Sequence, residues 1–214
     1  MTASNAEVAG CVAAFDFDGT LSTRDNFLPY LRIVAGTRDL ARAIATAAPA
    51  LAASRRDPHQ RDVAKAIVIR GTLAGRSEAS LRDLGARYAR LVVTRHLAPD
   101  TMARLEAHRA DGHALVLVSA SLHVYLDSIG ELLGVDAVLA TALEVNGDGR
   151  CTGELSGANV RGIEKVRRLD EWLAGRDVVI HAYGDSSGDD ELLARADHGV
   201  RVGRMQERSR GGRQ

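Results

Sequence analysis

The chain has 214 residues, of which 45% are hydrophobic and 26% charged, and this is enough apolar material for one core and a smaller companion domain. Lysine plus arginine equals aspartate plus glutamate at 28 each, so the zero net charge favours neither nucleic acid nor an anionic membrane as a partner. Aromatic residues, at 4%, are too few for base-stacking platforms. Two cysteines, Cys11 and Cys151, have no metal-finger spacing and no disulfide framework, which predicts a reducing, cytoplasmic location.

The N-terminal residues 1–9 are small and polar and lack a basic-then-apolar order, so we expect a loose leader and no signal peptide. The longest apolar stretch, residues 40–53, contains Arg42 and Pro49 and is too short to span a bilayer. These features predict a soluble protein without a transmembrane segment.

The first predicted strand is the apolar run 11–15, which is followed at once by Asp16 and Asp18. Two carboxylates therefore leave the C-terminal end of a strand, which is where ligands bind in open α/β sheets. Carboxylates this close repel each other unless a cation or a proton lies between them. The segment thus predicts an acidic, cation-binding site.

Residues 26–98 are expected to form a helical insert. Apolar residues recur there at helical spacing in stretches separated by breaks at Gly36, near Pro58 and at 71–75, which predicts about four helices. No segment of this region has the alternation of a strand. We therefore expect this insert to interrupt a larger domain made of residues 1–25 and 99–214.

After Pro99 strands and helices alternate, which predicts a parallel, doubly wound, Rossmann-like α/β sheet. An apolar strand at 114–118 leads to Ser119-Ala120-Ser121, and another at 178–183 leads to Gly184 and the acids after it. Asn146-Gly147-Asp148-Gly149, between short alternating flanks, indicates a β-hairpin. Polar clusters are thus predicted at the C-terminal ends of three strands.

The acids that follow the first and last of these strands form an all-oxygen ligand set, which suits Mg²⁺. With a phosphate held against such a metal, Asp16 can attack phosphorus and form an aspartyl-phosphate. Asp18 can protonate the leaving alkoxide and later take a proton from water. Lys165, in the first turn of a predicted helix, can balance charge, and Ser119 with nearby N–H groups can donate to phosphoryl oxygens.

The motifs resemble, in order, the four motifs of the haloacid dehalogenase (HAD) superfamily of phosphohydrolases. They are Asp-Phe-Asp-Gly-Thr from Asp16, Ser119 after a strand, Lys165, and Gly184-Asp185 with Asp189. The helical insert resembles the type-one cap of that superfamily, and the chain is most similar to its phosphoserine-phosphatase-like subclass IB. The resemblance extends over almost the whole chain.

The resemblance implies a role for each matched position. Asp16 would be the nucleophile, Asp18 the general acid and base, Ser119 the phosphate binder and Lys165 the charge stabiliser. Mg²⁺ would be held by Asp16, the Asp18 carbonyl and Asp185, with support from Asp189. The residues expected to contact substrate lie in the same motifs or just after them: Gly19, Thr20, Asp25, Ser119, Ala120 and Lys165.

The substrate is expected to be a small phosphometabolite. Asp25 falls where phosphoserine phosphatases carry a glutamate facing the substrate's amino group, which makes a phosphoserine-like substrate one candidate. Gly19 and Ser119-Ala120-Ser121 depart from the usual Ser and Ser-Gly-Gly of that subclass, and Arg70 lies near, but not at, the position of its carboxylate-binding arginine.

The sequence also fits other interpretations. The apolar face of residues 40–51 keeps open a lipid phosphate, such as a phosphatidylglycerophosphate, reached by transient contact with a membrane surface. A non-catalytic phosphate- or partner-binding protein on the same fold is a further alternative, and the chain is expected to be a monomer or a homodimer. Gly184-x-Ser186-x-Gly188 matches the nucleophile elbow of serine hydrolases, but that chemistry leaves Asp16, Asp18 and Lys165 without a role.

Overall fold

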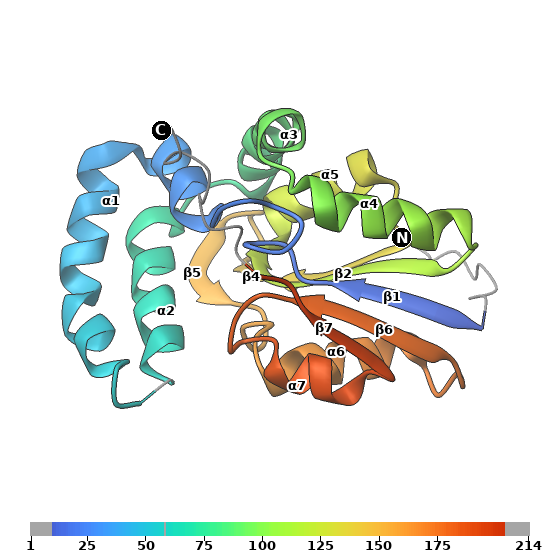
Figure 1. Ribbon diagram of the computed structural model, residues 1–214. Coiled ribbons are helices and arrows are strands. Elements are labelled where there is room, and N and C mark those ends of the chain that lie inside the picture. The colour runs from blue at the N-terminus through green and yellow to red at the C-terminus, as the bar shows by residue number, and fades with distance from the viewer. Residues whose placement is uncertain (1–9, 58, 204–214) are drawn as a thin grey trace, which may run out of the picture.

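The computed structural model describes residues 10–57 and 59–203, so the predicted leader and the basic tail from Arg204 lie outside the described residues. Its centre is a five-stranded sheet in the order β3-β2-β1-β6-β7, and every neighbouring pair is parallel (Figure 1). The strands are β1 (Cys11–Phe15), β2 (Ala114–Leu122), β3 (Ala137–Thr141), β6 (Val179–Gly184) and β7 (His198–Arg201). The predicted parallel, doubly wound sheet is confirmed.

Helices cover both faces of the sheet. The helices α4 (Pro99–Ala110) and α5 (His123–Leu133) lie on one face, and α6 (Ile163–Leu173) and α7 (Asp190–Arg195) lie on the other (Figure 1). Because successive strand residues point to opposite faces, Ala13 and Phe15 of β1 join one hydrophobic cluster while Val12 and Ala14 join the other. A strand buried on both sides is the reason that β1 has a continuous apolar run.

The predicted strand 114–118 is four residues longer in the structure. Its additional residues carry the Ser119-Ala120-Ser121 segment, and the register with β3 shifts between Ser119 and Leu122. Such an irregularity re-aims side chains at the end of a strand. The segment that follows the predicted strand is therefore a distorted strand end.

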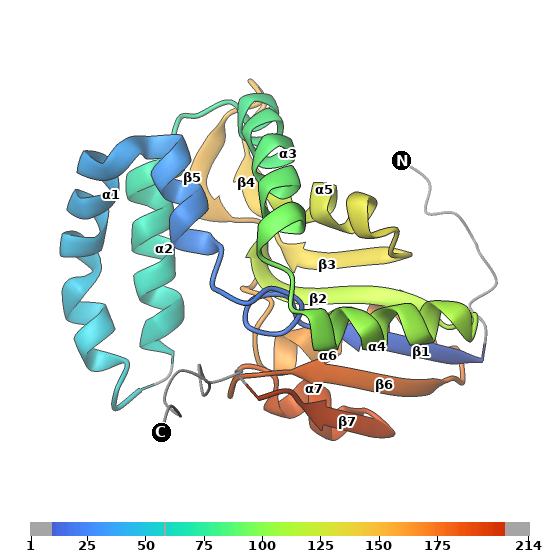
Figure 2. The same ribbon diagram turned by 45° about the horizontal axis from the view of Figure 1, so that its top comes forward.

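The insert contains the helices α1 (Phe27–Ala53), α2 (Gln60–Leu73) and α3 (Glu78–Arg95). In α1 the helical conformation is interrupted at Gly36, where φ is 78° and ψ is 167°, so the described part of the insert has four helical segments. The pair α1 and α2 stands away from the sheet, while α3 runs back toward α5 (Figure 2). The domain boundaries at 25/26 and 98/99 remain a prediction.

A close approach joins α3 to α5. A Cβ atom at Gly85 of α3 would lie 1.8 Å from the carbonyl oxygen of Val124, so only glycine permits this packing. Beside it, the side chains of Tyr30, Tyr88 and Tyr125 form a cluster with ring centroids 4.8–5.8 Å apart. The insert is thus anchored to the sheet domain through α3.

The predicted hairpin is present as an antiparallel pair of strands, β4 (Leu143–Val145) and β5 (Cys151–Leu155). The side chain of Asn146 accepts hydrogen bonds from the backbone N–H groups of Asp148 and Arg150, both at 3.0 Å, which holds the turn. An ion pair between Arg70 of α2 and Glu154 of β5 joins the hairpin to the insert. In the part of the chain that the structure describes, no helix is long and apolar enough to cross a membrane.

Candidate active site

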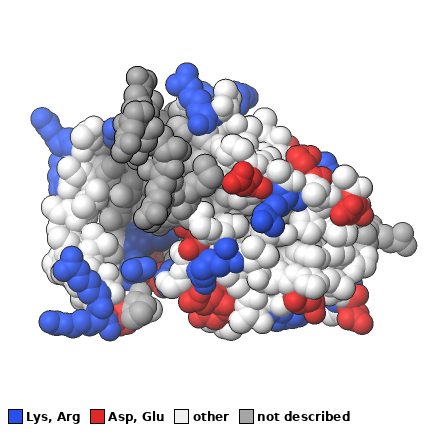
Figure 3. Space-filling view, viewed as in Figure 1, with Lys and Arg blue, Asp and Glu red and all other residues white. Residues whose placement is uncertain are grey.

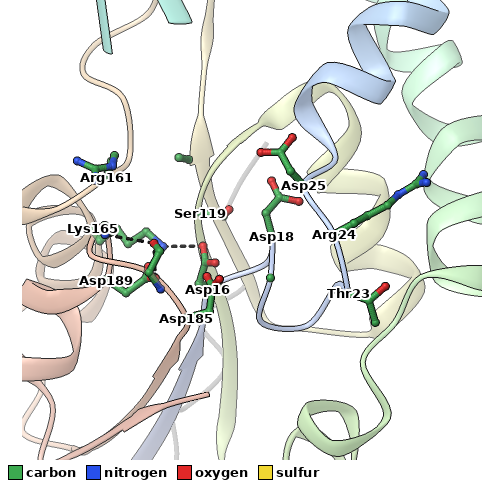
Figure 4. A pocket seen from close by; sticks show the side chains of 14 residues that line it. Asp16, Asp18, Thr23, Arg24, Asp25, Ser119, Arg161, Lys165, Asp185 and Asp189 are labelled. Atoms are coloured by element: carbon green, nitrogen blue, oxygen red, sulfur yellow. Dashed lines mark hydrogen bonds and ion pairs between the residues drawn. The ribbon is translucent and has the colours of Figure 1, made fainter. Parts of the chain in front are cut away.

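A cavity of about 380 Å³ lies at the C-terminal edge of the sheet, beside the insert (Figure 4). Figure 3 shows a hollow between the α1–α2 pair and the rest of the molecule, with basic and acidic side chains around it. Nine of the ten residues predicted for the site line this cavity: Asp16, Asp18, Gly19, Asp25, Ser119, Ala120, Lys165, Asp185 and Asp189. The tenth, Thr20, is buried, and its hydroxyl group lies 3.4 Å from Asp16 Oδ2.

Lys165 occupies the centre of the buried charge cluster. Its Nζ atom lies 2.6 Å from Asp16 Oδ1 and 2.6 Å from Asp189 Oδ1, and all three side chains are at most 8% exposed. Burial would lower the pKa of Lys165, but the two carboxylates raise it above its ordinary value. Lys165 is therefore a permanent cation that neutralises only part of the acidic charge.

Burial has a different outcome for each acid of this cluster. The pKa of Asp16 is raised, mainly because burial penalises its charged form, although Lys165 opposes the shift. For Asp189 the effect of burial is outweighed by the Lys165 ammonium and by hydrogen bonds from Ser186, so its pKa is lowered. An additional cation beside Asp16 would relieve the cost of holding it ionised.

Three carboxylates converge at one point of the cavity. Asp16, Asp185 and Asp189 each place one oxygen so that these atoms lie within 4.8 Å of one another. Gly19 makes this possible, because a Cβ atom there would lie 2.4 Å from Asp185 Oδ2 and its φ of +83° is unfavourable for other residues. Hard oxygen ligands in this number fit Mg²⁺ and suit a soft metal poorly.

Asp18 is held away from this cluster by residues of two other elements. Its Oδ1 atom accepts hydrogen bonds from Asn26 N at 3.0 Å and Asn26 Nδ2 at 2.7 Å, and its Oδ2 atom accepts one from Ser121 Oγ at 2.6 Å. Burial, and next the charge of Asp25, raise the pKa of Asp18 to about 7. Asp16 and Asp18 are only two positions apart in the sequence, but they have different hydrogen-bond partners and different orientations.

The remaining predicted residues take supporting positions. Ser119 is buried, and its Oγ atom accepts a hydrogen bond from Ser121 N at 3.2 Å. Asp25 is exposed at the mouth of the cavity, where its Oδ1 atom accepts from Phe27 N at 3.0 Å and so holds the start of α1. Asp25 therefore has a structural contact besides any contact with a substrate.

The serine-hydrolase alternative finds no support in the geometry of its nucleophile candidate. Ser186 Oγ donates to Asp189 Oδ2 at 2.9 Å, and Gly188 N donates to Ser186 Oγ at 3.2 Å, so the hydroxyl group stabilises its own loop. His198, the histidine that follows in the chain, lies on β7 with its ring 4.5 Å from that of His181. The Gly-x-Ser-x-Gly pattern is a turn that positions Asp189.

Sequence patterns missed several residues of the site. Asn26 and Ser121 orient Asp18, Arg161 and Arg24 line the cavity, and Lys65 of α2 reaches the carbonyl oxygen of Ala120. Ser121 belongs to a polar strand end that the sequence did indicate. No spacing signal marks Asn26 or Lys65, because their partners lie on other elements.

A parallel α/β sheet with an inserted helical unit and a lysine–carboxylate cluster at its C-terminal edge defines a class of hydrolase. The family model of the haloacid dehalogenase-like hydrolases matches residues 13–194, and the chain belongs to this family. The family is one of hydrolases, so the chain belongs to an enzyme family.

Relatives of this chain include Protein CicA of Caulobacter vibrioides, which is 38% identical over 193 residues, or 89% of this chain and 86% of CicA. A histidinol-phosphatase of Neisseria meningitidis is 27% identical over 127 residues, which are 56% of this chain and 57% of that enzyme. The chain is thus similar to a phosphatase over about half its length.

Solved structures share the fold. A protein of unknown function from Bordetella pertussis has a TM-score of 0.72 and 27% identity, and the match covers 86% of each chain. Phosphoserine phosphatases are further structural neighbours, among them a probable one from Vibrio cholerae with a TM-score of 0.60 at 19% identity, where the match covers 88% of this chain and 55% of that one. At that identity the likeness shows the fold alone.

Proposed function

We propose that this protein is a Mg²⁺-dependent phosphomonoesterase that works through an aspartyl-phosphate on Asp16. The observation that carries the proposal is the buried cluster in which Lys165 pairs with Asp16 and Asp189. A carboxylate oxygen of Asp185 lies within 4.8 Å of oxygens of both acids, close enough for the three to bind one metal ion. Three carboxylates and one ammonium leave a negative charge that a divalent cation would balance. Asp16, Asp185 and the Asp18 carbonyl would hold that cation, with Asp189 supporting them.

The first chemical step uses Asp16 and Asp18. Bound Mg²⁺ supplies charge neutralisation that allows a phosphate dianion to approach the carboxylates. An oxygen of Asp16 attacks phosphorus, the bond from phosphorus to the substrate's ester oxygen breaks, and the carboxyl group of Asp18 gives its proton to the departing alkoxide. Ser119 and Lys165 donate to the phosphoryl oxygens as charge spreads over them.

The second step returns the enzyme to its starting state. The Asp18 carboxylate takes a proton from water, the water oxygen attacks phosphorus, and the bond between phosphorus and Asp16 breaks. Inorganic phosphate leaves, and Asp18 is again protonated. The hydrogen bonds from Asn26 and Ser121 keep Asp18 pointed toward the cavity during both proton transfers.

The substrate that fits best is a small phosphomonoester. The acids Asp18 and Asp25 line the cavity, and Asp25 comes directly before the insert (Figure 4). A substrate with an ammonium group near its phosphate would meet favourable charge there. Phosphoserine and histidinol phosphate, the compounds for which two related phosphatases are named, both carry an amino group.

A lipid phosphate is the second candidate. Of the predicted apolar face of residues 40–51, Leu40 and Ala47 are buried in the core, and Leu51, at 45% exposed, remains free to contact a membrane surface. A phosphatidylglycerophosphate-like substrate would then be hydrolysed in mixed vesicles much faster than a water-soluble analogue. Equal rates on both would leave the small phosphometabolite as the better account.

The test is phosphate release from para-nitrophenyl phosphate with and without Mg²⁺. Wild type is compared with Asp16→Asn and with Asp190→Asn, an exposed acid on α7 that serves as the control. We expect Mg²⁺-dependent turnover in wild type and in the control and none in Asp16→Asn. Turnover that survives in Asp16→Asn contradicts an aspartyl-phosphate, and Mg²⁺ binding without any turnover indicates a phosphate-binding protein on this fold.

A further inference from the structure

Two side chains of α2 hold a single asparagine of the sheet domain. Asp62 and Lys65 lie three residues apart and so share one face of the helix. Asn159 Nδ2 donates to Asp62 Oδ1 at 2.7 Å, and Lys65 Nζ donates to Asn159 Oδ1 at 2.5 Å. The amide nitrogen of Asn159 thus donates to a carboxylate, and its amide oxygen accepts from an ammonium. We call Asp62, Lys65 and Asn159 together the α2 clamp.

Asn159 is itself fixed to the sheet. Thr141, the fully buried last residue of β3, donates through Oγ1 to Asn159 Oδ1 at 2.9 Å and accepts from Val160 N at 3.1 Å. The loop that holds Asn159 leads directly into α6, whose first turn carries Lys165. The α2 clamp thus ties the insert to the segment that positions Lys165.

Lys65 makes a second contact, with the end of β2. Its Nζ atom also donates to the carbonyl oxygen of Ala120, which lies between Ser119 and Ser121 and lines the cavity. The ring of Phe27, at the start of α1, lies 5.3 Å from the same atom. One ammonium of the insert therefore bridges the Ser119-Ala120-Ser121 segment and the loop before α6.

A second charged contact of α2, the ion pair between Arg70 and Glu154, is expected to contribute less to stability than the α2 clamp. Arg70 and Glu154 form an ion pair whose side chains are 62% and 47% exposed, and exposed pairs contribute little. Hydrogen bonds of an ammonium or a carboxylate to partly buried partners are about twice as strong as neutral ones. The α2 clamp is the better candidate for holding α2 in register with the cavity.

We infer that the α2 clamp is a positioning device for the reaction, which fixes the α1–α2 pair over the cavity and holds the Ala120 peptide in place for the phosphate site. Its kinetic consequence rests on the proposed function, whereas its structural consequence does not. Lys65 and Asp62 act through Ala120 and Asn159 and do not contact the substrate. A hydrogen bond to the Ala120 carbonyl orients the peptide plane between Ala120 and Ser121, so movement of α2 would alter the donors on the phosphate side.

The experiment compares Lys65→Met, Asn159→Leu and the double variant with wild type. Lys65→Arg keeps the charge and a donor, and Arg61→Met, an exposed neighbour on α2, is the matched control. Hydrolysis of para-nitrophenyl phosphate with Mg²⁺ gives kcat and KM, and hydrogen–deuterium exchange follows residues 60–73 and 114–122. We expect each single variant to lower kcat by about tenfold with a smaller change in KM, as loss of one charge-assisted contact predicts.

The double variant should be no worse than the worse single variant, because both break one coupled unit. Exchange in 60–73 should rise about tenfold in Lys65→Met while β1 stays protected, and Lys65→Arg should restore part of kcat. Additive effects with unchanged exchange would overturn the inference, and so would a rise in KM alone, which would place Lys65 on the substrate. If wild type shows no Mg²⁺-dependent turnover, the proposed function fails, and the exchange data still decide whether the α2 clamp holds α2.

Discussion

The Nζ atom of Lys165 lies 2.6 Å from Asp16 Oδ1, although 149 positions of the chain separate these residues. The parallel sheet brings them together, because Asp16 directly follows β1 and the first turn of α6 carries Lys165 to the same edge. The same ammonium lies 2.6 Å from Asp189 Oδ1. One buried cation therefore serves two acids, and removal of any member has consequences for both stability and chemistry.

Replacing Lys165 by methionine should destabilise the fold as well as abolish turnover. The change leaves Asp16 and Asp189 buried without their cation, and breaking a buried pair in this way costs about 3–5 kcal/mol. Urea unfolding at pH 7 measures the loss. Arg167→Met, an exposed change on the same helix, should cost much less, and similar losses in both variants would contradict the buried cluster.

Mg²⁺ should raise the melting temperature of wild type by binding the three acids. At a concentration about 100 times Kd, binding to the folded state alone stabilises it by about 2.7 kcal/mol. Asp185→Asn removes one charged ligand, so a much higher Mg²⁺ concentration should be needed for the same shift. Thermal melts over a Mg²⁺ series provide the measurement, with Asp190→Asn as the control. An equal response in Asp185→Asn would remove Asp185 from the site.

Substituting alanine at Gly85 should loosen the attachment of the insert. The new Cβ atom would lie 1.8 Å from the backbone carbonyl oxygen of Val124, so α3 and α5 must move apart. Overpacking of this kind costs about 1–3 kcal/mol, or more where only backbone can yield. Gly147→Ala, where no atom lies within 4 Å, should change stability little. Differential scanning calorimetry compares them, and equal melting temperatures would contradict the packing of α3 on α5.

His108 should make a contribution to stability that is lost below neutral pH. Its Nδ1 atom lies 2.7 Å from that of His113, its Nε2 atom lies 2.9 Å from the Tyr183 hydroxyl, and its ring centroid lies 4.8 Å from that of His181. Burial, and then the charges of His181 and His113, lower the pKa of His108 below its ordinary value of 6.5. The contribution of neutral His108 to the free energy of unfolding is therefore fully present above pH 6.5. It is lost as the pH falls from 6.5 toward the lower pKa that His108 has in the folded state.

Chemical denaturation between pH 8 and pH 5 tests this histidine prediction. Asp18, whose pKa is raised to about 7, stabilises the fold as the pH falls over the same range, so the contribution of His108 is the difference between wild type and His108→Gln. As the pH falls, wild type should lose stability relative to His108→Gln, because the variant lacks the group that resists protonation. Proton NMR should find His108 titrating below pH 6.5. A His108 pKa above that value would show that the pH dependence has another source.

Local sequence patterns were sufficient for the elements that carry the catalytic acids. A strand buried on both faces requires a continuous apolar run, as in 11–15, and the turn after it needs Gly19, whose φ is positive. The hairpin around Asn146 and the break at Gly36 were visible for the same reason. Each of these features depends on residues adjacent in the chain.

Contacts between distant elements could not be predicted in this way. Ser121 and Asp18 are 103 positions apart, and their 2.6 Å hydrogen bond depends on the register of β1 with β2 and on the irregular end of β2. Lys65 and Asn159 are 94 positions apart and meet because α2 lies against the loop before α6. Neither residue has a spacing pattern that distinguishes it from an ordinary polar side chain.

The sequence by itself determined the α/β architecture, the order of the four motifs and the acids that meet at the edge of the sheet, because apolar periodicity and strand-end composition are local properties. Only the tertiary structure decided how Asp18 is oriented, which acids share Lys165, and how α2 is fastened beside the cavity. Those relationships depend on which side chains face one another once the sheet and the insert have packed, and side-chain direction across elements is set by that packing and not by the spacing of residues along the chain.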